Sequence, residues 1–367
     1  MKRLFIILLL FVQYIPTAHS SWGATYEDDS RKVKIGGRIQ AIAEDNSDSD
    51  SQDFYLRRLR LNIVYQPWEK HTFVYDIRND KSNFEDDGDG GFAIGDAYWQ
   101  IDVEDSSWIN NVRLFRAKVD VSYSQTSSSK NLFNPDRTAP SEHAASYVVS
   151  NRRAANAQVN GNIDRLAFQL VISDGVQSDD LESSKGNRTV EKVIGQKFTY
   201  GGKLRYYFLG SSEENKVQDT FYGQKKSVSI GLGYFANDKI TTELSDTSEF
   251  SFSRDLVNAE LSVALNSFRL LAEYFEFGGD IVNLDETDKE EILGNSYGGY
   301  VSTEYVLHKW APYIGFEYLN RHRELKTYTL GLNYYELDAS RRYGIAYKRD
   351  GKGGESERTY AYAMLNF

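Results

Sequence analysis

Cysteine is absent from the 367 residues, and this excludes disulfide bonds and thiolate metal sites. Basic residues are outnumbered, 43 Lys and Arg against 53 Asp and Glu, so the net charge of -10 argues against a nucleic-acid partner. After the N-terminus no apolar run reaches the roughly 20 residues that a membrane-spanning helix needs. Proline is scarce, with five residues. The chain is therefore neither a disulfide-rich domain nor a helical membrane protein.

The N-terminus has the pattern of a secretory signal. Lys2 and Arg3 precede the short apolar run LFIILLLFVQYI and the sequence PTAHSS. A basic start, a short apolar stretch and a small-x-small site are typical of a signal peptide, here residues 1–20, cleaved after Ser20. The alternative, an uncleaved anchor helix, needs a longer run. We expect an exported protein with one domain over residues 21–367.

Aromatic and β-branched residues are abundant, with 26 Tyr and 20 Phe, and such residues favour strands. Apolar and polar residues alternate with a period of two along about sixteen segments, which indicates half-buried strands. No amphipathic helix longer than a turn or two is apparent. The segments are 33–43, 54–65, 71–79, 92–103, 112–121, 152–163, 165–173, 195–208, 226–236, 252–265, 268–277, 296–307, 311–320, 325–336, 341–349 and 359–367.

The connections between these segments alternate between short and long, with exceptions at 209–225 and 320–325. Short turns at one end and long polar loops at the other are typical of an outer-membrane barrel, whereas a soluble sandwich has no reason to sort its loops. The sequence therefore predicts an all-β fold: a transmembrane antiparallel β-barrel of about 16 strands, closed so that no strand edge meets lipid. The terminal strand, which ends at Phe367, is similar to the C-terminal strands of outer-membrane proteins.

The longest connection, Ser122 to Asn151, follows the fifth segment and is the third outer loop. We expect it to fold into the lumen, because a bare sixteen-stranded pore would select poorly. Lys130 and Arg137 are its candidate constriction residues. The alternative is a loop that lies on the outer surface.

Basic residues recur on the face opposite the apolar stripe, as in FYLRRLRLNIVY (Phe54–Tyr65). Inside a pore they would favour anions, and the arginine fork suits phosphate oxygens. Each could instead brace the wall by pairing with acids such as Asp76, Asp96 and Asp102. The pore-lining candidates are Lys34, Arg38, Arg58, Arg60, Arg78, Arg116, Lys118, Lys203 and Arg205.

Several motifs resemble the phosphate-selective porin O and P family: KIGGRIQ, FYLRRLRLNIVY, FVYDIRND, GDAYWQI and NRRAANAQVNG. The most specific is the arginine pattern of Arg57, Arg58 and Arg60. The resemblance implies a sixteen-stranded trimeric porin of the bacterial outer membrane, with a constricting third loop and an anion pathway lined by lysine and arginine. Its partners would be lipid, lipopolysaccharide and small anionic or hydrophilic solutes such as phosphate.

One stretch departs from that family. Where the family tends to have Gly-Gln-x-Lys-x-Pro, residues 115–120 read FRAKVD, and only Lys118 matches. The third loop offers two bases against Asp136 and Glu142. The sequence therefore predicts weak anion selectivity and does not specify phosphate.

Two other functions stay open on sequence grounds: a non-conducting structural or receptor barrel, and a barrel enzyme. Beyond the signal the histidines are His71, His143, His308 and His322, and only Ser141–His143 forms a local cluster. The acidic stretches 44–53 and 85–91 lack the spacing of a calcium loop. We assign no catalytic residue, cofactor or metal site.

Overall fold

The computed structural model describes residues 23–28, 31–80, 92–103, 108–127, 132–150, 154–177, 190–211, 226–244, 249–280, 296–321, 324–336, 341–351 and 356–366. The predicted signal peptide and Lys130 lie outside these residues. None of the helices within these ranges is long and apolar enough to span a membrane.

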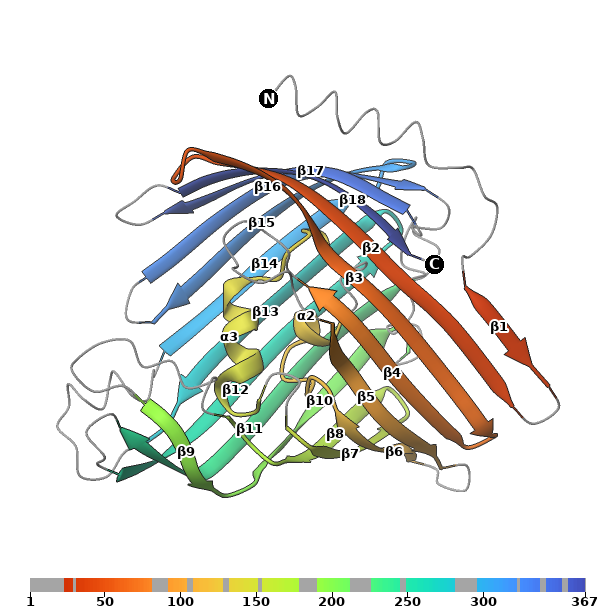
Figure 1. The fold of residues 1–367 in the computed structure, drawn as a ribbon, viewed down its shortest axis with the longest axis vertical. Helices are drawn as coiled ribbons and strands as arrows, with labels where there is room; N and C mark the ends of the chain where they lie inside the picture. The colour runs from red at the N-terminus through yellow and green to blue at the C-terminus, as the bar shows by residue number, and fades with distance from the viewer. Residues whose placement is uncertain are drawn as a thin grey trace.

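Sixteen antiparallel strands close a barrel, which confirms the predicted fold (Figure 1). Neighbours along the chain pair with one another, and the last strand pairs with the first, from Arg358 opposite Asn46 to Asn366 opposite Arg38. The strands are β2 (Lys32–Asn46), β3 (Ser51–Trp68), β4 (His71–Asp80), β5 (Ala93–Asp102), β6 (Ile109–Arg116), β7 (Asn156–Ile163), β8 (Leu166–Ser173), β10 (Thr199–Leu209), β11 (Ser227–Leu244), β12 (Glu249–Leu265), β13 (Phe268–Gly278), β14 (Ser296–Tyr305), β15 (Trp310–Asn320), β16 (Glu324–Glu336), β17 (Arg341–Gly351) and β18 (Ser356–Asn366).

Two further short strands prolong the wall at its ends. β1 (Ala24–Glu27) pairs with the start of β2, beyond the end of β18. β9 (Val190–Gln196) pairs with the outer part of β11, beyond the end of β10. The predicted segment 195–208 therefore begins earlier and contains a break between Gln196 and Thr199, whereas β1 was not predicted.

The outer face of the wall is apolar along the predicted alternation. Leu170, Leu232 and Leu330 are 59%, 64% and 60% exposed, values that in a water-soluble protein would be costly for so many neighbouring side chains. Four of the five tryptophans lie close to the short turns, namely Trp68, Trp99, Trp108 and Trp310. An apolar belt with an aromatic girdle at its edge is what a bilayer requires of a barrel.

The short turns share one end of the barrel. Asp164, Asn266 and His308 occupy them with φ of 51°, 53° and 59°, a left-handed conformation that these three residue types tolerate better than most. The long connections leave from the opposite end. By the usual arrangement of outer-membrane barrels, the turn end faces the periplasm and the other end faces outward.

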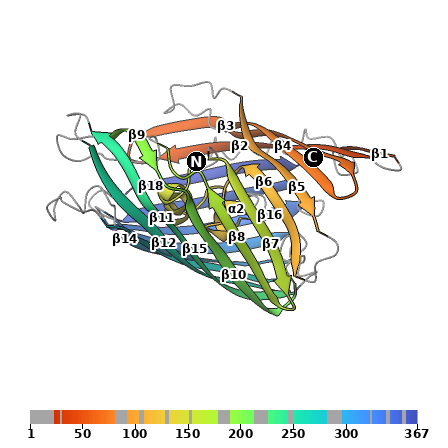
Figure 2. The same ribbon diagram turned by 90° about the horizontal axis from the view of Figure 1, so that it is seen from below.

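A long connection partly fills the interior of the barrel. The connection between β6 and β7, residues 117–155 and here called the third loop, contains the helices α2 (Tyr123–Thr126) and α3 (Ala139–Tyr147). Both helices lie within the ring of strands (Figures 1 and 2). Inward aromatic residues of the wall, including Phe235, Phe275 and Phe277, are no more than 1% exposed and belong to one cluster with loop residues such as Val148. The third loop therefore covers these inward aromatic residues of the wall.

Candidate permeation site

The third loop is held by acidic side chains on the inner face of the wall. Glu273 of β13 accepts hydrogen bonds from Ser122 Oγ at 2.7 Å, from the backbone N–H groups of Tyr123 at 2.8 Å and Ser124 at 3.1 Å, and from Tyr300 Oη at 2.5 Å. These N–H groups open α2, where a helix has unsatisfied donors and favours negative charge. Glu273 therefore fixes the beginning of the loop.

The second helix is fixed at both ends in the same way. Glu317 of β15 accepts the N–H of Ala139, the first residue of α3, at 2.8 Å. At the other end Arg254 of β12 donates to the carbonyl oxygen of Tyr147 at 3.1 Å. A carboxylate thus lies at the start of α3 and a guanidinium group lies at its end, which is the favourable arrangement for the helix dipole.

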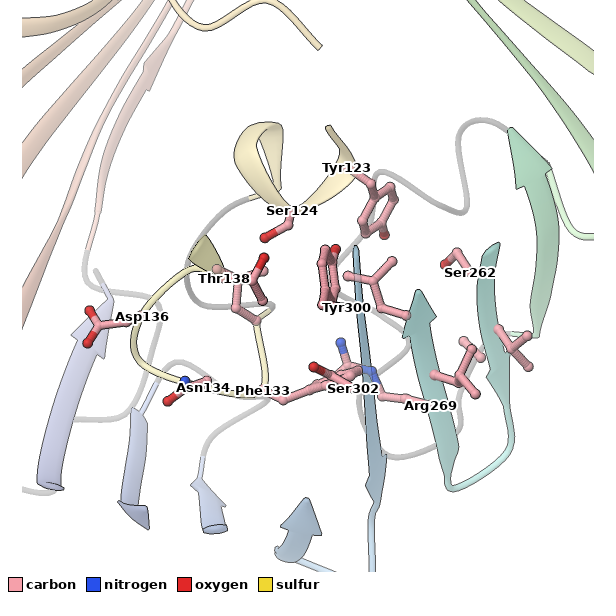
Figure 3. A pocket seen from close by; sticks show the side chains of 15 residues that line it. Tyr123, Ser124, Phe133, Asn134, Asp136, Thr138, Ser262, Arg269, Tyr300 and Ser302 are labelled. Atoms are coloured by element: carbon pink, nitrogen blue, oxygen red, sulfur yellow. The ribbon is translucent and has the colours of Figure 1, made fainter. Parts of the chain in front are cut away.

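A small cavity remains between the loop and the wall of β12–β14. It measures about 60 Å³ and is lined by residues that include Tyr123, Tyr300, Arg269 and Ser302 (Figure 3). Arg269 forms a salt bridge with Glu304 at 2.8 Å. At roughly 10–15 Å³ for each water, the cavity has room for a few water molecules and is too small for a solute path.

The opposite wall has a different character, because three arginines stand side by side on it. Arg38 on β2 is the direct cross-strand partner of Arg60 on β3, and Arg60 is the direct partner of Arg78 on β4. Like charges directly opposite each other destabilise a sheet. A row of three concentrates positive charge on this part of the wall. We call Arg38, Arg60 and Arg78 the arginine row.

A β-bulge brings a further arginine to the same side. The pairing of β2 with β3 shifts between Arg58, opposite Gln40, and Leu56, opposite Ala41, so Arg57 is the extra residue. Arg57 Nε donates to Asp136 at 3.2 Å, and Arg58 donates to Gln40 and, at 2.9 Å, to the carbonyl oxygen of Pro135. Both consecutive arginines therefore face the loop. Strict alternation would have sent Arg57 to the lipid, which is why sequence analysis missed it.

Gly95 explains part of the GDAYWQI motif. A β-carbon at this position would lie 2.4 Å from Asp76 Oδ2 and 3.0 Å from Arg78 Cδ. Only a residue without a side chain leaves these two groups where they are. Asp76 and Asp96 are the carboxylates that the arginine row meets on β4 and β5, and the charges of Arg60 and Arg78 act on Asp96.

The loop contributes its own charges to this region. Arg60, Arg137 and Asp96 lie close enough to Lys118 for their charges to act on its ammonium group. Burial, together with the charge of Arg137, lowers the pKa of Lys118 to about 7. Burial raises the pKa of Glu142, but Lys118 and Arg137 outweigh it and hold the pKa below its usual value. The same balance, with Arg57 and Arg58, lowers the pKa of Asp136.

Arg137 has a second role within the loop. It donates from Nε to the carbonyl oxygen of Ser124 at 3.1 Å, and from Nη2 to those of Gln125 at 3.3 Å and Ser127 at 3.2 Å. It therefore caps the end of α2 while its charge acts on Arg38, Arg58 and Lys118. Of the sequence candidates, Arg38, Arg58, Arg60, Arg78, Lys118 and Arg137 are brought together.

Comparison with known proteins decides the family. The profile of the phosphate-selective porin O and P family matches residues 33–347. The chain belongs to that family. Family and fold together make the protein an outer-membrane diffusion channel, a porin. No curated protein matches the sequence.

Solved structures agree with the porin fold at low sequence identity. An anion-selective porin from Comamonas acidovorans is 12% identical with a TM-score of 0.60, over 92% of this chain and all of that one. Salmonella typhi OmpF, in complex with daunomycin, is 12% identical at 0.62, over 94% and 100%. The outer membrane channel DcaP of Acinetobacter baumannii is 12% identical at 0.52, with the same coverage. At such identities the likeness shows the fold alone.

Two further pore-lining candidates, Lys203 and Arg205 on β10, form salt bridges with acidic residues. Lys203 Nζ lies 2.9 Å from Glu260 Oε2 and 3.1 Å from Asp120 Oδ1. Arg205 pairs with Glu260 and lies 3.8 Å from Asp120. Two bases face two acids, so this cluster joins the start of the loop to β10 and β12 and adds little net charge.

The structure corrects the placement of Arg116. On β6 it shares the face of Val112 and Leu114, and its side chain, like that of Leu114, is exposed on the outer surface. The predicted segment 112–121 runs on through Ala117, Val119 and Val121, whose alternation with Arg116 places Arg116 on the inward face. The strand ends at Arg116, and those three residues pack inside the loop cluster.

Arg113 is an inward base of β6 that the sequence analysis missed. Its guanidinium lies 4.5 Å from the ring centroid of Tyr98 and donates to Gln100 at 3.0 Å. Its alternation with Leu114 was the available signal. Lys34 is exposed on the inward parity of β2, near the periplasmic end.

The residues considered for an enzyme serve the packing of the loop. Ser141 Oγ donates to the carbonyl oxygen of Thr138 at 2.9 Å, and the ring of His143 packs 4.4 Å from that of Phe277, centroid to centroid. Among the described residues, no group of three or more His, Asp or Glu side chains could hold a metal ion.

Proposed function

We propose that the porin conducts small anions in preference to cations, along a path between the arginine row and the third loop. The observation that carries the proposal is the pairing of Arg38 with Arg60 and of Arg60 with Arg78. Fixed cations in a narrow pore lower the energy of an anion and raise that of a cation. Asp76, Asp96, Asp136 and Glu142 temper this field, so the expected preference is moderate and no dedicated phosphate site is required.

The third loop is proposed as the constriction. Its described parts are tied to Glu273, Glu317 and Arg254 on one wall and to Arg57 and Arg58 on the other. A loop bound at both sides of the lumen narrows the passage and holds Lys118 and Arg137 near the arginine row. Such a loop supplies the selectivity that sixteen strands alone would lack.

Planar-bilayer recording tests the proposal. In a KCl gradient the reversal potential is expected to have the sign of chloride preference. A clear preference for potassium would reject anion selectivity. An absence of conductance would instead favour the structural or receptor barrel.

Assembly and export are also proposals. We propose a homotrimer, which light scattering of the detergent-solubilised protein would show as three times the mass of one chain. We propose export through the periplasm after cleavage behind Ser20, so that mass spectrometry of the membrane-extracted protein finds Ser21 as the first residue. We propose no enzymatic activity, because Ser141 and His143 are engaged in loop packing.

A further inference from the structure

The outer face of the barrel carries a hollow of about 780 Å³ that has no part in the proposed ion path. It lies over β4–β8, and its lining extends from Trp99, toward the short turns, to Arg116 and Asp174, at the end from which the long connections leave. Its lining includes exposed apolar side chains that point away from the lumen, such as Tyr75, Leu114 and Ile172 at 47%, 48% and 45% exposure.

Two alanines create this hollow in an otherwise bulky surface. One outward row of cross-strand partners runs Trp99, Leu114, Ala157, Ile172, Tyr200. The row above it runs Tyr75, Ala97, Arg116. Ala97 and Ala157 are the small members of the two rows, so they form a floor between large neighbours.

Arg116 stands at the edge of that floor with its side chain exposed. No described carboxylate pairs with it, although Asp174 also borders the hollow. An arginine on the lipid face of a barrel is unfavourable near the middle of the bilayer and is tolerated at the interface. Tyr75 and Tyr200, exposed in these two rows, are typical of the aromatic girdle that marks the interface.

We propose that this hollow binds an anionic acylated lipid of the outer leaflet, with its phosphate on Arg116 and an acyl chain over Ala97 and Ala157. The guanidinium fork matches phosphate oxygens and supplies the counter-charge that the described protein groups do not. The surrounding aromatic and aliphatic side chains match the acyl chain. The lipid completes an electrostatic contact that the barrel leaves open on its own surface.

Native mass spectrometry of the whole porin in detergent, with diphosphorylated lipid A as the probe, tests this proposal. Wild-type protein is expected to retain the lipid, and Arg116→Gln to bind it about tenfold more weakly, the size of one charge-assisted hydrogen bond. Arg116→Lys keeps the charge and is expected to retain most of the binding. Ala157→Trp fills the floor and is expected to abolish it.

Two controls separate the lipid site from its alternatives. Arg165→Gln removes an exposed arginine at the opposite end of the barrel, where the residue donates to the carbonyl oxygen of Phe208, and is expected to leave binding unchanged. Dephosphorylated lipid A is expected to bind wild type as weakly as the diphosphorylated form binds Arg116→Gln.

Three results would overturn the proposal. Equal binding by wild type and Arg116→Gln would remove the phosphate contact. A change of oligomeric state in Ala157→Trp, without a change in lipid binding, would make the hollow an interface between copies of this chain. A loss of anion selectivity in Arg116→Gln would return Arg116 to the pore. Because the ion path is measured separately by reversal potential, failure of the lipid site leaves the proposed function standing.

Discussion

The two halves of the lumen wall use the same residue types for opposite purposes. On β10–β15, Lys203, Arg205 and Arg269 each face a carboxylate at salt-bridge distance, and Glu273 and Glu317 are occupied by loop N–H groups. On β2–β4 arginine faces arginine. Inward charge alone therefore does not identify a pore residue. The groups that surround a base, on the wall and on the third loop, have to be known before a role in the pore can be proposed for it.

The largest expected effect is a direct contrast between the two halves. Arg60→Gln removes the central charge of the arginine row and is expected to lower the chloride-to-potassium permeability ratio about tenfold, since a unit charge at roughly 12 Å contributes about 1.4 kcal/mol at an effective dielectric constant of 20. Lys203→Gln, in the paired cluster, is expected to change it less than about twofold. Reversal potentials in a KCl gradient measure both, and equal effects would contradict the distinction.

Loss of the loop anchor is the next largest effect. Glu273→Gln keeps the size of the side chain but removes the negative charge that accepts hydrogen bonds from α2 and Tyr300. We expect this to weaken the buried hydrogen-bond network by about 2–4 kcal/mol. We expect noisier open-channel currents and a lower urea midpoint for unfolding. Glu276→Gln, an exposed position on the same strand, is the control. Quiet currents in Glu273→Gln would show that Glu273 does not hold the loop.

A change of pH tests whether the charge of Lys118, close to the arginine row, contributes to anion selectivity. Its folded pKa of about 7 means that the ammonium group is mostly charged at pH 6 and mostly neutral at pH 9. Anion selectivity is therefore expected to rise, by about threefold or less, as the pH falls from 9 to 6. Lys118→Gln is expected to flatten this profile. A pH dependence that survives in the variant would have another origin.

The smallest effect concerns the space behind the arginine row. Gly95→Val places methyl groups against Asp76 and Arg78, which must move, and we expect a two- to threefold change in permeability ratio. Gly195→Val is the matched control, because a β-carbon at Gly195 meets nothing within 4 Å. Matching effects of the two substitutions on selectivity would mean that Gly95 serves strand geometry rather than the row.

Much of the fold followed from the sequence because lipid imposes a strict rule. Period-two alternation with an apolar outer face is the only strand pattern that a bilayer tolerates, so the barrel and most strands could be predicted. The rule fails where the chain leaves the wall. Ala117, Val119 and Val121 alternate like strand residues, and only the packing of these residues inside the loop cluster reveals that the strand has ended.

The candidate site could be predicted only in part, for a related reason. Alternation correctly predicts the inner wall for Arg38, Arg58, Arg60 and Arg78. Arg57 reaches that wall through a β-bulge that no residue pattern predicted. Register between strands, which sets Arg60 opposite both Arg38 and Arg78, depends on long-range pairing and is not written in any single segment.

The sequence by itself determined which strand positions face lipid and which face the interior, because apolar side chains alternate with charged and small ones. It also determined that the third outer connection is long. What the tertiary structure decided is which charges meet. Partners such as Glu273 and Tyr123, or Lys203 and Glu260, are far apart along the chain, and electrostatic energy depends on distance in space, so their pairing was fixed only when the barrel closed around its loop.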